Sequence, residues 1–294
     1  MHKSGFVNII GNPNVGKSTL MNALVGEKLS IITSKAQTTR HRILGIVNGD
    51  DFQIVFSDTP GILKPCYKLQ ESMMNFVRGA LSDADVLLYV TDTVERDDER
   101  AAEIIDRIRQ SGVPTLVVVN KIDLTTQEAL EALVEKWRAT LPDAEIIPIS
   151  AREGFNIAGL FDRILALLPE GEPFYPKDTL TDKTLRFFAS EIIREKILRN
   201  YDKEIPYSCE IEIEEYREEP GIDRISAVIY VARNSQKGIL IGHKGEKLKK
   251  VGRQAREELE EFLRKKVFLQ LFVKVSEDWR NDQWQLRRFG YDPQ

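Results

Sequence analysis

Short apolar runs alternate with longer amphipathic stretches through the first half of the chain. The runs lack the strict alternation of a strand with one wet face, so they predict strands buried on both faces. They occupy residues 5–10, 52–56, 86–90, 114–119 and 145–149, and stretches with apolar residues at helical spacing occupy 20–25, 99–109, 127–140 and 157–168. Strands joined by helical crossovers predict an α/β fold with a doubly wound parallel sheet.

A hairpin adds one exception to this parallel order. Residues 43–49 are followed closely by the apolar run that starts at Phe52, and the sequence Asn-Gly-Asp-Asp at 48–51 is typical of a tight turn. We therefore expect one antiparallel strand at the edge of the sheet.

The pattern changes after a stretch rich in helix breakers. Residues 168–176 contain three prolines and one glycine, which exclude a helix or a central strand. The chain beyond them predicts a helix at 185–200, strands at 207–213 and 225–231, a short helix at 235–241, a basic helix at 244–262 and a strand at 267–275. This order predicts a second, α+β domain. We place the two domains at 1–170 and 181–294, with a linker at 171–180.

Charge is distributed unevenly between the two halves. The 294 residues carry 42 Lys and Arg against 46 Asp and Glu, a net charge of −4, which excludes a uniformly basic nucleic-acid coat. Residues 1–172 have 18 basic and 24 acidic side chains, whereas residues 173–294 have 24 basic and 22 acidic ones. A polyanionic partner is therefore expected to meet the second half.

Cysteine and histidine are scarce. The two cysteines, Cys66 and Cys209, are too few for a disulfide framework, and the three histidines supply no cluster of metal ligands. The apolar runs have the length of strands and the N-terminus lacks an apolar signal segment, so we expect neither a membrane span nor a signal peptide. These features favour the cytoplasm, and they leave peripheral membrane contact open.

Residues 11–18, Gly-Asn-Pro-Asn-Val-Gly-Lys-Ser, follow the first predicted strand and open the first predicted helix. They match the phosphate-binding motif G-x-x-x-x-G-K-[ST] in the context that it requires. The glycines let backbone N–H groups turn toward phosphate oxygens, Lys17 reaches the terminal phosphates, and the Ser18 hydroxyl ligates Mg²⁺. The expected phosphate-binding residues are Gly11, Asn12, Pro13, Asn14, Val15, Gly16, Lys17, Ser18 and Thr19.

Three more motifs end predicted strands, where parallel sheets bind ligands. Asp58 is placed to hold Mg²⁺, and the Gly61 N–H to sense the γ-phosphate. The Asp123 carboxylate can accept both N1–H and the 2-amino group of guanine, which adenine cannot offer, so we expect GTP and GDP. The residues of these motifs are Asp58, Thr59, Pro60, Gly61, Asn120, Lys121, Ile122, Asp123, Ser150 and Ala151.

Four motifs in this order resemble a translation-factor-class GTPase. The polar residues 27–41 then resemble a switch I loop, and Thr38-Thr39-Arg40 resembles the corresponding sequence of the TrmE–Era–EngA group. This resemblance implies that Thr39, or alternatively Thr38, ligates Mg²⁺ beside Ser18 and Asp58. The catalytic residues that it implies are Lys17, Thr39 and Gly61.

Two positions bear on the mechanism. Ile62 stands where Ras-like proteins have the glutamine that orients the attacking water, and isoleucine cannot hydrogen-bond water. We therefore expect slow intrinsic hydrolysis. Asn14 matches an asparagine that ligates potassium in related GTPases, so K⁺ is a second expected cation, although a turn-forming role is the open alternative.

In the second half, residues 237–256 hold seven Lys and Arg against one acid, Glu246. Gly242-His-Lys-Gly245 is similar to the G-x-x-G loop with which KH domains clamp four nucleotides, and the predicted element order fits a type II KH fold. The glycines permit close approach to phosphates, and the following helix supplies positive potential. The expected RNA-binding residues are Ile239, Ile241, Gly242, His243, Lys244, Gly245, Lys247 and Lys250, with Leu240 and Lys249 beside them.

A GTPase domain followed by a type II KH domain resembles one branch of the TrmE–Era–EngA group over nearly the whole chain. That resemblance implies binding near the 3′ end of 16S ribosomal RNA, assembly of the 30S ribosomal subunit, and a cytoplasmic location with some peripheral contact with the inner face of the cell membrane. DNA is not an expected partner. Three alternatives stay open: a GTPase that recruits a tRNA-modifying partner, a membrane-surface switch, and a constitutive RNA-binding protein.

Overall fold

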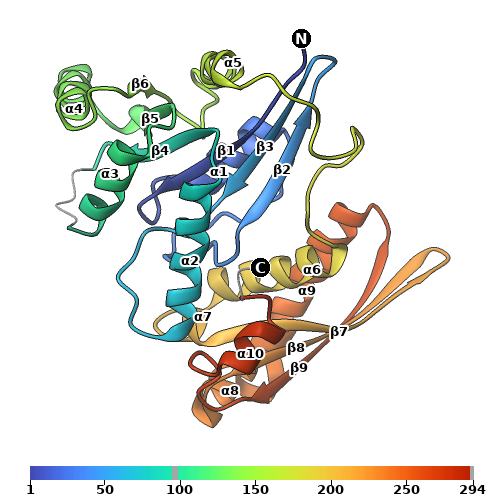
Figure 1. Cartoon of the computed structure of the whole chain (residues 1–294). Helices are drawn as coiled ribbons and strands as arrows, with labels where there is room; N and C mark the ends of the chain where they lie inside the picture. Colours follow the sequence, from blue (N-terminus) through green and yellow to red (C-terminus); the bar gives the residue numbers. More distant parts are fainter. Residues whose placement is uncertain (95–98, 292–294) are drawn as a thin grey trace. The chain divides into compact units, whose positions relative to one another are not determined.

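The protein is described by a computed structural model over residues 1–94 and 99–291. These residues form two compact units. Residues 1–66 and 70–182 form the first, and residues 67–69 with the chain from 183 onward form the second. Each unit is built around its own sheet (Figure 1).

Within the described part of the first unit, six strands form one sheet in the order β2-β3-β1-β4-β5-β6. The strands are β1 (Lys3–Gly11), β2 (Ile43–Asn48), β3 (Phe52–Asp58), β4 (Val86–Asp92), β5 (Thr115–Asn120) and β6 (Glu145–Pro148). All neighbours are parallel except β2 and β3, which pair antiparallel across the predicted hairpin. The predicted doubly wound α/β fold is confirmed.

Helices cover both faces of this sheet. They are α1 (Lys17–Val25), α2 (Lys68–Ser82), α3 (Glu99–Ser111), α4 (Gln127–Thr140), α5 (Ile157–Leu167) and the short 3₁₀ helix η1 (Ile122–Leu124). Apolar residues of α2, α3 and α4 pack with residues of β1, β4 and β5 into one buried core, and α1 lies on β1–β3 and contacts α5. The helices cover both faces of the sheet, so a ligand can reach the strands only at their ends. Every phosphate- or base-site motif lies at the carboxyl ends.

The second unit has a three-stranded sheet in the order β7-β8-β9 among its described residues. Its elements are α6 (Leu185–Asn200), α7 (Ile205–Ser208), β7 (Cys209–Glu219), β8 (Ile222–Val231), α8 (Asn234–Ile241), η2 (His243–Gly245), α9 (Glu246–Leu263), β9 (Lys266–Val275) and α10 (Gln283–Arg288). Strands β7 and β8 are antiparallel, and β8 and β9 are parallel. Residues of α6, α8 and α9 share one core with the sheet, as the predicted type II KH order requires.

Two elements differ from the prediction in extent. Strands β7 and β8 extend well beyond 213 and 225 to form a long hairpin, with a register shift between Ile213 and Glu215. A bulge changes which residues face each side of the sheet, so the alternation of apolar and polar residues does not continue through it and does not predict the full length of the strand. The basic helix α9 starts at Glu246 rather than at 244, because Lys244 (φ 49°) and Gly245 (φ 79°) have left-handed backbone.

Among residues 1–94 and 99–291, no helix has both the length and the apolar character that crossing a membrane requires.

Candidate functional site

The loop between β1 and α1 is shaped by glycine. Gly16 precedes α1 with φ 97°, and a Cβ there would lie 2.2 Å from Nδ2 of Asn120. A Cβ on Gly11 (φ 150°) would lie 2.1 Å from the Val90 carbonyl oxygen. Side chains are therefore excluded at both positions, and the loop presents backbone N–H groups at the N-terminus of a helix, an arrangement that binds anions.

Lys17 is buried inside this loop. Its Nζ donates to the carbonyl oxygens of Gly11 (3.0 Å) and Asn12 (2.9 Å). Burial lowers the pKa of Lys17 from 10.5 to about 8, against the opposing charge of Asp58. The ammonium group is thus desolvated, and among the described residues its hydrogen-bond acceptors are neutral carbonyl oxygens, which makes it a strong partner for a phosphate.

Three oxygen-bearing side chains converge beside the loop. Ser18 Oγ lies 2.8 Å from Thr39 Oγ1 and donates to Asp58 Oδ2 at 2.7 Å, and Thr39 Oγ1 donates to the same oxygen at 3.3 Å. Asp58 is fully buried, and desolvation raises the pKa of its carboxyl group. Its Oδ1 has no hydrogen-bond partner among the described residues. Hard oxygens around an unsatisfied carboxylate fit Mg²⁺.

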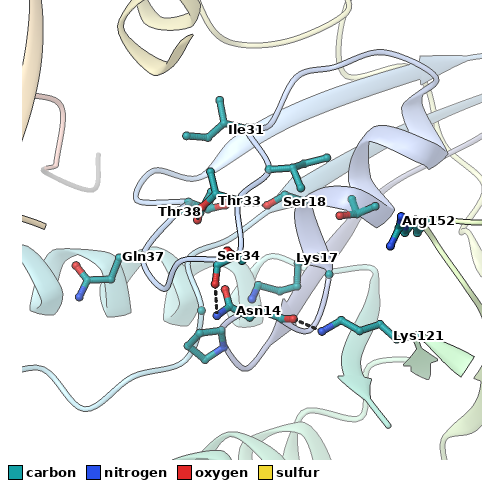
Figure 2. Close-up of a pocket in the computed structure, with 16 residues that line it drawn as sticks. Asn14, Lys17, Ser18, Ile31, Thr33, Ser34, Gln37, Thr38, Lys121 and Arg152 are labelled. Carbon is teal, nitrogen blue, oxygen red and sulfur yellow. Dashed lines mark hydrogen bonds between the residues drawn. The ribbon is translucent and has the colours of Figure 1, made fainter. Parts of the chain in front are cut away.

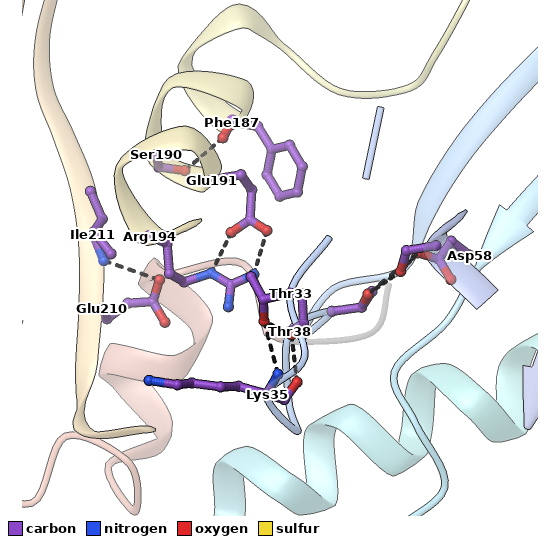
Figure 3. Close-up of polar contacts among 12 residues, drawn as sticks. Thr33, Lys35, Thr38, Asp58, Phe187, Ser190, Glu191, Arg194, Glu210 and Ile211 are labelled. Carbon is purple, nitrogen blue, oxygen red and sulfur yellow. Dashed lines mark hydrogen bonds and ion pairs between the residues drawn. The ribbon is translucent and has the colours of Figure 1, made fainter. Parts of the chain in front are cut away.

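The neighbouring hydroxyl, that of Thr38, faces another way. Thr38 Oγ1 lies 2.6 Å from Thr33 Oγ1 and donates to the Lys35 carbonyl oxygen at 2.6 Å (Figure 3). These bonds connect the two ends of the segment 33–38 to each other. Of the two threonines that the sequence leaves open, the geometry therefore brings Thr39 to Ser18 and Asp58.

Asn120 joins three loops at the other end of the site. Its Nδ2 donates to the Val15 carbonyl oxygen (2.9 Å), and its Oδ1 accepts from the backbone N–H groups of Lys121 (2.8 Å) and Ala151 (2.9 Å). The exposed Asp123 accepts a bond from Ser150 Oγ at 2.6 Å, which orients its carboxylate. The structure thus brings the predicted base-site residues together from loops far apart in the sequence.

A cavity of about 430 Å³ opens along these loops (Figure 2). Lys121 borders it and donates to the Asn14 carbonyl oxygen (2.5 Å) and to Asp92 Oδ2 (2.8 Å). Asn14 Nδ2 donates to the Ser34 carbonyl oxygen at 3.1 Å. The lining residues that the sequence analysis did not single out are Ile31, Ile32, Thr33, Ser34, Gln37 and Arg152. Arg152 directly follows Ser150-Ala151, and its place after that pair is the signal that would have found it.

The segment after Asp58 packs tightly against the phosphate loop. Thr59 Oγ1 donates to the Ile9 carbonyl oxygen (2.7 Å), and a Cβ on Gly61 would lie 2.8 Å from Cα of Pro13. Ile62 is 1% exposed and packs in the core, while its N–H donates to the Gly11 carbonyl oxygen at 3.1 Å. Its side chain is therefore turned away from the site. Of the remaining predicted residues, Asn12 and Pro60 lie in these loops, Thr19 lies in the first turn of α1, and Ile122 begins η1.

In the second unit, the G-x-x-G loop forms a tight turn between α8 and α9. Gly242 (φ 73°) and Gly245 (φ 79°) both have positive φ, and a Cβ on Gly242 would lie 2.8 Å from the Lys247 side chain. His243 and Lys244 at its tip are exposed, as are Lys247 and Lys250 on the first turns of α9. Ile239 is 45% exposed and Ile241 is half-buried.

Leu240 corrects one expectation. It is expected beside the RNA-binding residues, but it is fully buried in the core, and its carbonyl oxygen accepts a bond from the Tyr201 hydroxyl at 2.6 Å. In the helical turn 239–241, Ile239 is exposed and Ile241 packs partly buried against the same core, because the helix must bury one side against the sheet.

A groove of about 390 Å³ runs from the loop along α9 and β9. Its basic wall is formed by α9 and its apolar wall by β9. The lining residues are Gly245, Leu248, Lys249, Gly252, Arg253, Arg256, Leu269 and Leu271. A Cβ on Gly252 would lie 3.3 Å from Leu271, so glycine lets the two walls approach. Lys249 is expected only beside the site, and the strand predicted at 267–275 carries no binding role in the sequence.

Most C-terminal aromatic residues serve packing. Trp279 is fully buried and donates to the Ser208 carbonyl oxygen at 3.0 Å, and the Tyr291 hydroxyl donates to Glu210 at 2.6 Å. Glu210 is therefore buried, in contrast to the solvent-facing strand that its acidic surroundings suggest. Trp284, by comparison, is 67% exposed.

Comparison with known families matches both units. The family described as 50S ribosome-binding GTPase matches residues 6–121, and the KH domain family matches residues 204–280. Over the whole length, the chain is 46% identical to GTPase Era of Syntrophus aciditrophicus, covering 99% of this chain and 96% of that protein. It is 45% identical to GTPase Era of Staphylococcus haemolyticus, covering 99% and 97%.

Solved structures of full length are similar as well. A crystal structure of Era in complex with MgGDPNP and nucleotides 1506–1542 of 16S ribosomal RNA has a TM-score of 0.95, with 42% identity and full coverage of both chains. A variant of Aquifex aeolicus Era bound to GDP·AlF4⁻ has a TM-score of 0.95 at 43% identity, covering 99% of this chain and 100% of that one. From its identity to these relatives over nearly all of its length, this chain belongs to the Era family of GTPases.

Proposed function

We propose that this GTPase is a switch that binds 16S ribosomal RNA near its 3′ end and acts in assembly of the 30S subunit. One observation carries the proposal. A single chain holds an enclosed site for a nucleotide and an open, basic groove, and a relative of the same fold carries MgGDPNP and an RNA segment. The division into a GTPase domain, a linker and a KH domain at 1–170, 171–180 and 181–294 is part of this proposal.

In the nucleotide site, we assign each role from the chemistry of the residue. Asp123 accepts from guanine, oriented by Ser150, and the backbone between Gly11 and Ser18 receives the phosphates. Lys17 leaves its carbonyl partners for the β- and γ-phosphates, where its charge offsets the charge that develops in the transition state.

Ser18, Thr39 and Asp58 are the residues that would hold Mg²⁺. When bound there, Mg²⁺ supplies further neutralisation of phosphate charge. The Gly61 N–H faces the γ-phosphate, whereas the buried Ile62 offers nothing to the attacking water. Backbone groups or a partner must then orient that water, so intrinsic hydrolysis is slow; a turnover above about 1 s⁻¹ without partners would contradict this.

Asn14 is the proposed K⁺ ligand. Its Nδ2 donates to the Ser34 carbonyl oxygen at 3.1 Å, and its Oδ1 is the atom that would hold K⁺. Replacing K⁺ by Na⁺ should slow hydrolysis, and an unchanged rate would remove this part of the proposal.

In the second unit, the proposed RNA site is the loop 242–245 together with the α9–β9 groove. Three cations of α9, Lys249, Arg253 and Arg256, line the groove, and the leucines of β9 offer an apolar wall for bases. Single-stranded RNA suits this shape, since its bases are free to enter a narrow groove.

We further propose that the linker transmits the difference between the GTP- and GDP-bound states from switch I to the second unit. Ile46 N–H donates to the Leu180 carbonyl oxygen (2.8 Å), Thr181 Oγ1 donates to the Leu44 carbonyl oxygen (2.7 Å), and Leu44 N–H donates to Asp182 (3.0 Å). Strand β2 follows switch I directly, and the linker leads to Thr184, which caps α6. Movement of switch I therefore has a bonded route to the second unit.

The test is crosslinking and sequencing of RNA bound to the GTP-loaded protein and to a Gly242→Asp, Gly245→Asp variant. Enrichment of the 3′ segment of 16S ribosomal RNA that the variant loses is the expected result. Reads from tRNA or diffuse reads, unaffected by the variant, would overturn the RNA assignment and favour a tRNA-linked role. Equal RNA affinity of the GTP- and GDP-bound forms would overturn the coupling alone.

A further inference from the structure

Arg42 lies at the centre of a polar network that none of the nucleotide motifs includes. Its Nε donates to Ser57 Oγ (2.6 Å), and its Nη2 donates to Asn8 Oδ1 (3.1 Å). The same guanidinium makes a two-pronged ion pair with Asp83, at 2.6 and 3.0 Å. Asn8 completes the network by donating to the Ala80 carbonyl oxygen (2.6 Å) and to Asp83 (2.7 Å).

The partners of Arg42 stand next to the parts of the nucleotide site. Arg42 precedes β2 and lies three residues after Thr39, while Ser57 directly precedes Asp58. Asn8 pairs with Ser57 in the β1–β3 register, three residues before Gly11. Asp83 directly follows α2, the helix that continues the segment after Gly61. One side chain therefore links the residues after Thr39 to the residue before Asp58, to the strand that supports the phosphate loop and to the C-terminal end of α2.

The network is built to hold a fixed geometry. Asn8 and Ser57 are fully buried, and the Arg42 side chain is 18% exposed. The guanidinium donates to three different residues in one plane, and its bonds to the carboxylate are charge-assisted. A lysine would keep the charge but could not reproduce this planar fork.

We propose that Arg42 is a positioning residue that couples switch I to α2, so that ordering Thr39 around the terminal phosphate also fixes the segment after Asp58. The proposal rests on the nucleotide-site roles assigned above and is independent of RNA binding. It implies a difference between nucleotides. GDP lacks the γ-phosphate that both switches would meet, so loss of the coupling weakens retention of GTP more than retention of GDP.

The experiment measures dissociation rates of a fluorescent GTP analogue and of fluorescent GDP, with Mg²⁺ present, for wild type, Arg42→Met and Asp83→Asn. Loss of this charge-assisted network is expected to raise the dissociation rate of the GTP analogue by about tenfold and that of GDP by less than about twofold. The double variant should add little to either single change, because both remove the same network. Arg163→Met, which breaks the Arg163–Glu145 pair between α5 and β6, is the matched control and should leave both rates unchanged.

Equal acceleration for both nucleotides would show a merely structural role and overturn the proposal, as would no acceleration. If Arg42→Met does not fold, Arg42→Lys keeps the positive charge and should still release the GTP analogue faster than wild type, with GDP release unchanged. Thr39→Ala tests the role assigned to Thr39 in the nucleotide site separately from the coupling proposed for Arg42. If it leaves the Mg²⁺ dependence of GTP retention intact, the assigned role of Thr39 fails, whereas an unchanged ratio of rates in the Arg42 variants counts against the coupling itself.

Discussion

Two loops of this protein each place a glycine with positive φ directly before a helix, but one of these glycines is tightly packed and the other is surrounded by open space. The loop at 11–18 ends in Gly16 (φ 97°) before α1, and the loop at 242–245 ends in Gly245 (φ 79°) before α9. A Cβ on Gly16 would collide with Asn120 at 2.2 Å, whereas the nearest atom to a Cβ on Gly245 lies 4.0 Å away, on the flexible Lys249 side chain. Both offer a helix N-terminus to phosphate, but only the first is enclosed.

The difference matches the ligands proposed for them. In the first loop the essential cation, Lys17, is buried, and the other site residues are held at the ends of four strands. Such a site can select one small molecule by shape and hydrogen bonding. In the second loop, Lys244 and Lys247 are exposed, which suits the repeating backbone of a polymer. Substitutions should therefore cost far more at the first loop than at the second.

The largest effect is expected from Asp123→Asn. A carboxylate has two acceptor oxygens and an amide has one, so the variant cannot accept from both N1–H and the 2-amino group of guanine, and kcat/KM for GTP should fall on the order of 10⁴-fold. Xanthosine triphosphate, which carries an oxygen in place of the amino group, should become the better substrate. Asp143→Asn, at an exposed position in the α4–β6 loop, is the control, and a retained preference for GTP in Asp123→Asn would refute the base site.

Lys17→Met should be next in size. Removing the cation that meets the β- and γ-phosphates should reduce kcat by about 10²- to 10³-fold in single-turnover hydrolysis. Lys3→Met is a matched control, because Lys3 Nζ also donates to backbone carbonyl oxygens, those of Leu165 (2.9 Å) and Ala166 (3.2 Å), away from the site. Equal losses in the two variants would mean that the effect reflects folding.

Gly245→Asp tests the open loop. The new carboxylate should repel phosphates and lower affinity for a single-stranded 16S 3′-end RNA by about tenfold. Gly221→Asp is matched to it, since Gly221 has φ 81° and open space around it in the β7–β8 turn, so both variants have the same backbone strain. Binding measured by fluorescence anisotropy should fall only for Gly245→Asp, and a similar loss in both would contradict the proposed site.

The same contrast explains how much the sequence could predict. The residues of the nucleotide site lie in short contiguous motifs because phosphate and guanine demand fixed residue types at fixed spacing, and the doubly wound sheet follows from apolar runs alone. Leu269 and Leu271 gave no such signal. Their alternation in β9 is identical to that of core residues, and only the packing of α9 shows that they line a groove.

Arg42 was missed for a related reason. Its partners Ser57, Asn8 and Asp83 are separated from it by 15, 34 and 41 positions, and a charged residue next to a predicted strand usually faces solvent. Glu210 is likewise buried, with a hydrogen bond from the Tyr291 hydroxyl, 81 positions away. Long-range polar pairs follow from tertiary packing, which hydrophobic periodicity does not encode.

The smallest expected effect is a pH dependence that only the enclosed loop can show. In the nucleotide-free protein the pKa of Lys17 is lowered by burial to about 8, whereas in the unfolded chain it is 10.5. Between these values the unfolded chain binds more protons than the folded one, so the contribution of Lys17 to the free energy of unfolding rises with pH, by about 1 kcal/mol between pH 8 and pH 9.

The measurement is urea unfolding of wild type and Lys17→Met at both pH values, with and without GDP. Subtracting the Lys17→Met curve removes the titration of the other lysines and tyrosines, which is common to both proteins. Without nucleotide, wild type should gain stability relative to the variant as pH rises. With GDP bound, the phosphates hold the proton on Lys17 and the gain should vanish, so a gain of equal size in both conditions would place Lys17 away from the phosphates.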